Sequence, residues 1–159
     1  MYCPLTRGEA GIDGIPPEQS ATIREAEERE AARVVGLDTV EFLGLPDSVL
    51  KDGVPPRREI TRVVRRHKPE IVITLNFADR WAGGGFNTAD HPDTRHAVDI
   101  TDTFEPGVES LKAHRKYLDR LGWEKFDPAE SLEGLARQTG TRLGVPMAVG
   151  LEVHDLGGR

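Results

Sequence analysis

A polar segment at positions 76–93 carries the residues of this sequence that best suit metal chemistry. Asp90 and His91 are adjacent and Asp93 follows, so an imidazole and two carboxylates are concentrated there. These are ligand types of a catalytic Zn²⁺, which takes about three protein ligands and keeps one position open for water. A His in a polar loop is more often a solvated surface group, so the spacing alone favours that interpretation over a zinc site.

Two other clusters could be functional, but their surroundings favour a structural role. Gly83, Gly84 and Gly85 could cradle a phosphate, but the Lys-Ser/Thr pair of a P-loop does not follow them, which favours a plain loop. A run of basic residues lies on a predicted helix whose apolar residues face inward, which is typical of a solvated face. This run consists of Arg57, Arg58, Arg62, Arg65, Arg66 and Lys68.

The apolar pattern predicts helices that alternate with short strands. Helices are expected over 18–35, about 56–67, 106 to about 121 and 128 to about 138, and strands over 39–43, 71–75, 97–100 and 148–153. The β-branched run at 71–75 is the clearest strand, because a continuous apolar run is typical of a strand covered on both faces. The alternation predicts one α/β domain over 1–159 with a largely parallel sheet. Ligands of such sheets bind beyond the carboxyl ends of the strands, where the 76–93 segment begins.

Composition excludes several classes of protein. The 159 residues include 21 Lys+Arg and 27 Asp+Glu, and this net charge of −6 argues against a dedicated nucleic-acid binder. We expect no membrane span, because no apolar run approaches the roughly 18 residues that a span needs. Cys3 is the single cysteine and cannot form an internal disulfide, which fits a cytoplasmic protein. The composition leaves the oligomeric state open.

Several short motifs follow one another in an order that is shared with a known family. They are TRGEAG at 6–11, REAE at 24–27, AA at 31–32, GL at 36–37, LGLPDS at 43–48, KPEIVIT at 68–74, ADH at 89–91, HAVDITD at 96–102 and LKAH at 111–114. This succession resembles the PIG-L/LmbE family of zinc-dependent N-deacetylases. The resemblance implies a Rossmann-like α/β fold, with a mostly parallel sheet and helices on both faces. It also implies hydrolysis of the acetamide group of a small amino-sugar conjugate of the N-acetylglucosamine type.

The resemblance also assigns site residues. In the family, zinc polarises the amide carbonyl and activates a water, an Asp removes the proton, and a His stabilises the oxyanion. The chain's Asp-His pair matches the end of a later His-Pro-Asp-His-like motif, so His91 is the expected zinc ligand. The family's substrate-binding positions fall on Glu9, Arg24 and Asp47, whose side chains can hydrogen-bond to sugar or inositol hydroxyls.

The sequence departs from the family pattern in three places. Thr88 stands where the later motif has its catalytic His, and an alternative alignment makes His91 the oxyanion residue and places Thr94 at the metal position. The chain also contains no early His-Pro-Asp-Asp motif, which in the family supplies two zinc ligands and the Asp base. We expect that motif, and with it the catalytic base, upstream of Met1, so that the domain is truncated at its N-terminus. His91 and Ala97 are only six positions apart, so we also expect an internal shortening.

These departures leave three interpretations of the chain. The first is an N-deacetylase by descent with one zinc ligand in place of three, which predicts weak zinc binding and little or no hydrolysis. The second is a catalytically inactive paralogue that serves as a sugar-binding or interaction module. The third is that Met1 is a mis-assigned start and that the functional protein is longer.

Overall fold

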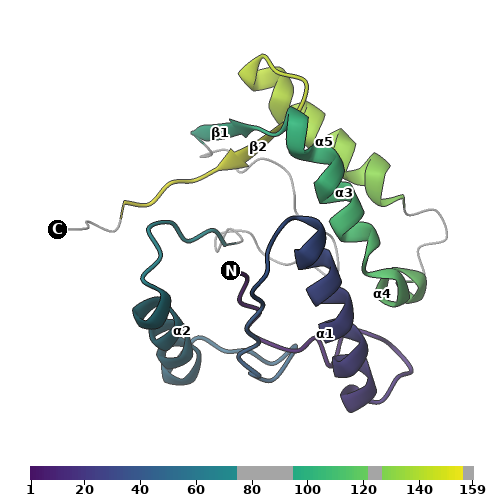
Figure 1. Cartoon of the computed structure of the whole chain (residues 1–159), viewed down its shortest axis with the longest axis vertical. Helices are drawn as coiled ribbons and strands as arrows, with labels where there is room; N and C mark the ends of the chain where they lie inside the picture. The colour runs from purple at the N-terminus through teal and green to yellow at the C-terminus, as the bar shows by residue number, and fades with distance from the viewer. Residues whose placement is uncertain (75–94, 122–126, 156–159) are drawn as a thin grey trace. The chain divides into compact units, whose positions relative to one another are not determined.

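A computed structural model describes residues 1–74, 95–121 and 127–155 (Figure 1). Its elements are α1 (Pro17–Val34), α2 (Val54–His67), β1 (His96–Asp99), a 3₁₀ turn (Thr101–Thr103), α3 (Phe104–Lys112), α4 (Arg115–Arg120), α5 (Pro128–Leu143) and β2 (Ala148–Leu151). The chain divides into two compact units, Met1–Val72 with Pro106–Phe126, and Ile73–Glu105 with Asp127–Arg159. Among the described residues, no helix combines the length and the apolar character that crossing a membrane requires.

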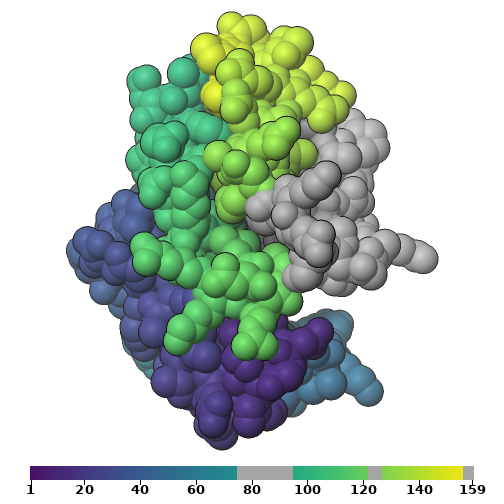
Figure 2. Space-filling view, turned by 90° about the vertical axis from the view of Figure 1, so that its right-hand side faces the viewer, coloured from purple at the N-terminus to yellow at the C-terminus, as the bar shows by residue number. Residues whose placement is uncertain are grey.

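Helix α1 provides much of the core of the first unit. Ala21, Ala31 and Ala32 are buried on it, and Val108 of α3 is fully buried. Small alanine side chains allow a neighbouring segment to approach closely, and Ser110 Oγ donates a hydrogen bond of 3.0 Å to the carbonyl of Ala31. In Figure 2 the green surface of the α3–α4 segment lies directly on the blue surface of α1. Helix α1 therefore forms the base on which the second half of this unit packs.

The end of α1 is encoded locally. Gly36 adopts a left-handed backbone with φ of 76°, which costs glycine little. Its N–H donates to the carbonyl of Arg33 at 3.1 Å, and the N–H of Leu37 donates to the carbonyl of Ala32 at 2.9 Å. This pair of bonds is the Schellman arrangement. The predicted helix over 18–35 is confirmed, with bounds shifted by one residue.

After this turn the chain runs parallel to its own N-terminal segment. Tyr2 and Val40 form a parallel bridge. Tyr2 N donates to the carbonyl of Thr39 at 2.8 Å, and further along Leu45 N donates to the carbonyl of Leu5 at 2.9 Å. The predicted strand over 39–43 is thus reduced to a bridge at Val40. The bonds place the turn that follows Leu5 beside the loop that follows Leu45, where two of the predicted substrate residues lie.

The strand predicted over 71–75 is wrong in its described part. Residues 71–74 have no strand structure, and the side chains of Ile71, Val72 and Ile73 are 78%, 62% and 80% exposed. A strand exists only when a neighbouring segment pairs with its backbone groups, and no described residue pairs with this run. Position 75 lies outside the described residues.

The single helix predicted from 106 to about 121 is also wrong, because two helices replace it. Helix α3 ends at Lys112 and α4 begins at Arg115. Between them His114 has ψ of 48°, which is not helical. The N–H of Lys116, at the start of α4, donates to the Glu27 carboxylate on α1 at 2.6 Å. This tertiary bond satisfies an amide that a helix start leaves without a partner.

The second unit packs α5 against a two-stranded sheet. Strands β1 and β2 are antiparallel, with His96 opposite Leu151 and Asp99 opposite Ala148. The strands predicted over 97–100 and 148–153 are therefore confirmed in kind, but the prediction of parallel pairing fails for this sheet. Because antiparallel strands pair directly, they do not depend on a crossover helix, and the alternation of elements does not reveal this case.

Helix α5 begins and ends at signals in the sequence. The Asp127 carboxylate accepts hydrogen bonds from the N–H groups of Ala129 at 2.7 Å and Glu130 at 3.2 Å, which is an N-cap. Gly144 closes the helix in a left-handed conformation. The predicted helix from 128 to about 138 is confirmed and extends to Leu143.

Candidate functional site

Glu9 and Asp47 lie on neighbouring loops, and each carboxylate accepts a hydrogen bond from a backbone N–H of the other loop. The N–H of Asp47 donates to Glu9 Oε1 at 2.9 Å, and the N–H of Ala10 donates to Asp47 Oδ2 at 3.1 Å. Asp47 Oδ1 also accepts from Thr6 Oγ1 at 3.2 Å. The two predicted substrate residues are therefore brought together, and their carboxylates fix the two loops to each other.

The environment of Glu9 favours its charged form. Partial burial by itself raises the pKa of Glu9. The hydrogen bonds donated by the backbone amides of Asp47 and Arg7 act in the opposite direction and outweigh burial, so the pKa lies below its ordinary value. Glu9 is thus a carboxylate at neutral pH. An ionised carboxylate has about four lone-pair directions, so these amides do not exhaust its acceptor capacity.

Arg24, the third predicted substrate residue, lies on α1 beneath the same turn. Gly8 has φ of 69°, and a Cβ added to it would lie 3.1 Å from Arg24 Cβ and 3.2 Å from Arg24 Nε. A side chain at position 8 would therefore press on Arg24. Ser20, which is fully buried on α1, fixes the turn from below, because its Oγ donates to the carbonyl of Gly8 at 3.1 Å. The turn that carries Glu9 thus rests directly on Arg24.

His114 is a part of this site that the sequence did not reveal. Its position on an expected helix, beside two basic residues, predicts a surface side chain. The structure places its Nδ1 3.0 Å from Arg24 Nη1, and the His114 side chain is only 13% exposed. The LKAH motif at 111–114 pointed to this region, but the helix break that turns His114 toward α1 leaves no trace in the apolar pattern.

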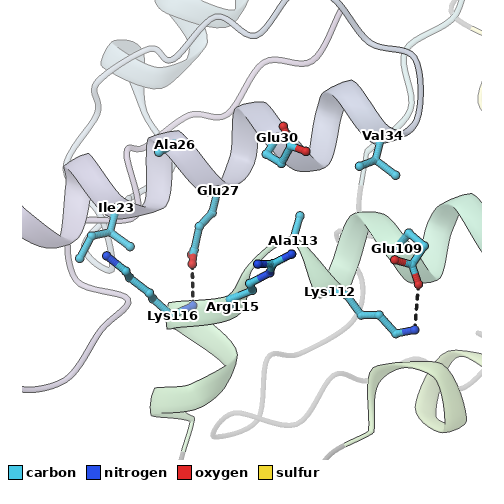
Figure 3. Close-up of a pocket in the computed structure, with 10 residues that line it drawn as sticks. All are labelled: Ile23, Ala26, Glu27, Glu30, Val34, Glu109, Lys112, Ala113, Arg115 and Lys116. Atoms are coloured by element: carbon cyan, nitrogen blue, oxygen red, sulfur yellow. Dashed lines mark hydrogen bonds and ion pairs between the residues drawn. The ribbon is translucent and has the colours of Figure 1, made fainter.

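A groove of about 750 Å³ runs between α1 and the α3–α4 segment (Figure 3). Its apolar floor includes Ile23 and Ala26. Charged residues of both signs line it, namely Glu27, Glu30, Glu109, Lys112, Arg115 and Lys116. Glu27 points into the groove toward the backbone of Lys116, as Figure 3 shows. Because three acids and three bases line it, the groove carries no single charge that would select an ionic ligand.

The expected zinc ligand His91 lies outside the described residues. Within the described ranges no group of three or more His, Cys, Asp or Glu side chains is arranged to hold a metal ion. The described residues therefore supply no zinc centre by themselves.

The sequence is similar to a family of deacetylases and to a deacetylase of known name. A family model described as PIG-L, GlcNAc-PI de-N-acetylase, matches residues 1–101. A diacetylchitobiose deacetylase of Thermococcus kodakarensis is 32% identical over 99 residues, which is 61% of this chain and 34% of that protein. The match thus spans about a third of the length of this relative.

Two solved structures have similar folds. The N,N′-diacetylchitobiose deacetylase of Pyrococcus horikoshii, in complex with an inhibitor, superposes with a TM-score of 0.75 at 22% identity, covering 94% of this chain and 70% of that one. A conserved protein of Thermus thermophilus superposes with a TM-score of 0.71 at 27% identity, covering 97% of this chain and 82% of that one. The fold that they share with this chain is α/β.

Proposed function

The chain belongs to the PIG-L family of GlcNAc-PI de-N-acetylases, and from this premise we propose that it binds a GlcNAc-like sugar conjugate as a metal-dependent N-deacetylase by descent. The reaction class is hydrolysis of the acetamide C–N bond, which yields a free amine and acetate. The observation that carries the proposal is the convergence of Glu9, Asp47 and Arg24 on the turn at 6–11. A Rossmann-like arrangement of the remaining sheet is part of this proposal, and the parallel bonds from Tyr2 to Leu5 support it.

The three residues offer a sugar both acceptors and a donor of hydrogen bonds. The Glu9 and Asp47 carboxylates accept hydrogen bonds, so they suit hydroxyl groups, which donate. The Arg24 guanidinium only donates, so it suits a hydroxyl or carbonyl oxygen. Because the loop amides already orient both carboxylates, little side-chain freedom remains to be lost when a ligand binds.

Zinc is the metal that we propose, with His91 as a ligand. A bound zinc ion would polarise the acetamide carbonyl and lower the pKa of a bound water. His-Pro-Asp-Asp does not occur in the 159 residues. We therefore propose that this chain hydrolyses the amide slowly or not at all.

An inactive sugar-binding module is the second candidate. It is favoured by the retention of the substrate-side residues in a sequence without the early metal motif. Both candidates predict sugar binding, and only the deacetylase can release acetate, so detectable release from one preparation excludes the inactive module.

The test is a titration of the 159-residue chain with diacetylchitobiose in the presence of EDTA, followed by NMR. We expect perturbed amide signals at 6–11 and 45–48, and a loss of at least about tenfold in affinity for Arg24→Ala. Arg33→Ala is the matched control, because Arg33 lies on the same helix and pairs only with the exposed Glu30 among the described residues. Unperturbed signals in both loops would overturn the proposal.

Acetate release with added zinc separates the two candidates. Release above the rate of a zinc blank favours the deacetylase, and binding without release favours the sugar-binding module.

A further inference from the structure

Within the described residues, the Arg24 guanidinium is held through one of its nitrogens. Nη1 lies 3.0 Å from His114 Nδ1 and 3.4 Å from Glu27 Oε2. These two contacts use both hydrogens of Nη1. The Tyr117 ring lies against the guanidinium, with its centroid 4.1 Å from Cζ. Nη2 has no hydrogen-bond acceptor among the described residues, although the Arg24 side chain is only 18% exposed.

The contact with Arg24 defines the proton position on His114. A guanidinium can only donate, so Nδ1 must offer its lone pair and the ring proton must lie on Nε2. Nε2 lies 3.9 Å from Glu28 Oε2. The imidazole is therefore neutral, and burial, followed by the Arg24 charge, lowers the pKa of His114 to about 4. The neutral His114 therefore holds Arg24 and leaves its positive charge intact. A second carboxylate in the same place would neutralise that charge.

The other groups that face this cluster come from three segments. Glu27 and Glu28 lie on α1, Tyr2 on the N-terminal segment and Tyr117 on α4. Burial, before any other cause, raises the pKa of Glu28 and of Tyr2, and these two side chains share a hydrogen bond. Glu27 contacts Arg24 through Oε2 and accepts a hydrogen bond from the Lys116 amide through Oε1. No acid in this set neutralises Arg24 through two parallel hydrogen bonds.

We infer that His114 and Tyr117 are positioning residues for Arg24. His114 fixes one edge of the guanidinium and Tyr117 supports its face, so that Nη2 is directed at an acceptor oxygen of the bound sugar. The inference rests on the proposed function. A charge-assisted donor that is already in place binds more strongly than one that must first be ordered.

The test compares variants that keep or remove each contact. His114→Asn retains an acceptor near the Nδ1 position, and His114→Leu removes it. Tyr117→Phe keeps the ring, and Tyr117→Leu removes it. We expect affinity for diacetylchitobiose, measured at about pH 7.5 with EDTA, to fall about tenfold in the two Leu variants and to stay within about twofold in the other two. His67→Asn, on the exposed end of α2, is the control.

NMR supplies a readout that a purely structural role would not change. We expect the ¹⁵N shifts of His114 to indicate a proton on Nε2 alone, and the Arg24 Nε–H signal to broaden in His114→Leu while the backbone spectrum persists. A proton on Nδ1, or wild-type affinity in a folded His114→Leu, would overturn the inference. If the wild-type chain binds no sugar, the proposed function fails, while the Arg24 signal still decides whether His114 holds it.

Discussion

Glu9 and Asp47 connect their two loops through a reciprocal pair of hydrogen bonds. The Asp47 N–H donates to Glu9 Oε1 at 2.9 Å, and the N–H of Ala10, the residue after Glu9, donates to Asp47 Oδ2 at 3.1 Å. The two carboxylates therefore have a structural role before any ligand arrives. Substituting either residue changes the shape of the site as well as its chemistry. A loss of binding in these variants must be compared with their stability.

We expect Asp47→Ala to lower the free energy of unfolding by about 1–3 kcal/mol. The substitution removes the acceptor for the Ala10 amide and the Thr6 hydroxyl, and hydrogen bonds to charged groups contribute on this scale. Urea unfolding measures the change. The exposed Asp38 provides the control, since Asp38→Ala should stay within about 0.5 kcal/mol of the wild type. Equal changes in the two variants would show that the hydrogen bonds of Asp47 contribute nothing to the free energy of unfolding.

Glu9→Gln should make the thermal stability of the protein depend less on pH in the acid range. The folded-state pKa of Glu9 lies below its ordinary value of 4.5. Its contribution is therefore fully present above that pH and is lost as the pH falls through the folded-state pKa. Thermal unfolding between pH 5 and about pH 3 should show a smaller decrease for the variant than for the wild type. Parallel curves would contradict this assignment.

His114 should make the protein less stable as the pH falls from 6.5 to about 4. Above 6.5 the ring is neutral in both states. Between these values the His114 ring binds a proton in the unfolded chain but not in the folded chain, so stability is lost as the solution becomes more acidic. Glu28, whose folded-state pKa is raised, contributes the opposite slope. The measurement is therefore the difference in melting temperature between wild type and His114→Asn at each pH.

As the pH decreases, the melting temperature of His114→Asn should rise relative to that of the wild type, because asparagine does not titrate. A difference that is constant from pH 7 to about pH 5 would rule out a protonation cost at His114.

A pair of glycines on α5 tests packing in the second unit. A Cβ at Gly140 would lie 2.6 Å from the Val145 carbonyl oxygen and 2.8 Å from that of Pro146, whereas one at Gly134 meets no atom within 4 Å. We expect Gly140→Ala to cost about 1–3 kcal/mol, because backbone oxygens cannot move aside easily. Gly134→Ala should stabilise the protein by about 0.5–1 kcal/mol through helix propensity. Chemical unfolding of both variants checks the opposite signs.

Zinc binding by the chain should be weak and should depend on His91. Structural zinc sites use four protein ligands and catalytic sites about three, and the sequence lacks the early motif that would supply two of them. Calorimetric titration should therefore give a low affinity, which His91→Ala lowers further and His67→Ala does not. Stoichiometric tight binding together with measurable deacetylation would contradict this prediction.

The helices show what can be predicted from local sequence. Pro17 at the start of α1, Gly36 after it, Asp127 before α5 and Gly144 after it each act on backbone groups a few residues away. Such signals are contained within one turn of chain, so they are visible without knowledge of the fold. The motif order that indicated the family and selected Glu9, Arg24 and Asp47 is likewise a property of the sequence alone.

The strands and the contacts of the site required the tertiary structure. The run at 71–74 has the composition of a strand and lacks a partner among the described residues. Arg24 and His114 meet across 90 positions, and Glu9 meets the Asp47 backbone across 38. Hydrogen bonds across such separations depend on where the backbone brings each group, which no local pattern specifies. The sequence by itself determined which residues could bind a sugar, and only the folded chain decided that His114 holds Arg24 and that Glu9 and Asp47 hold each other's loops.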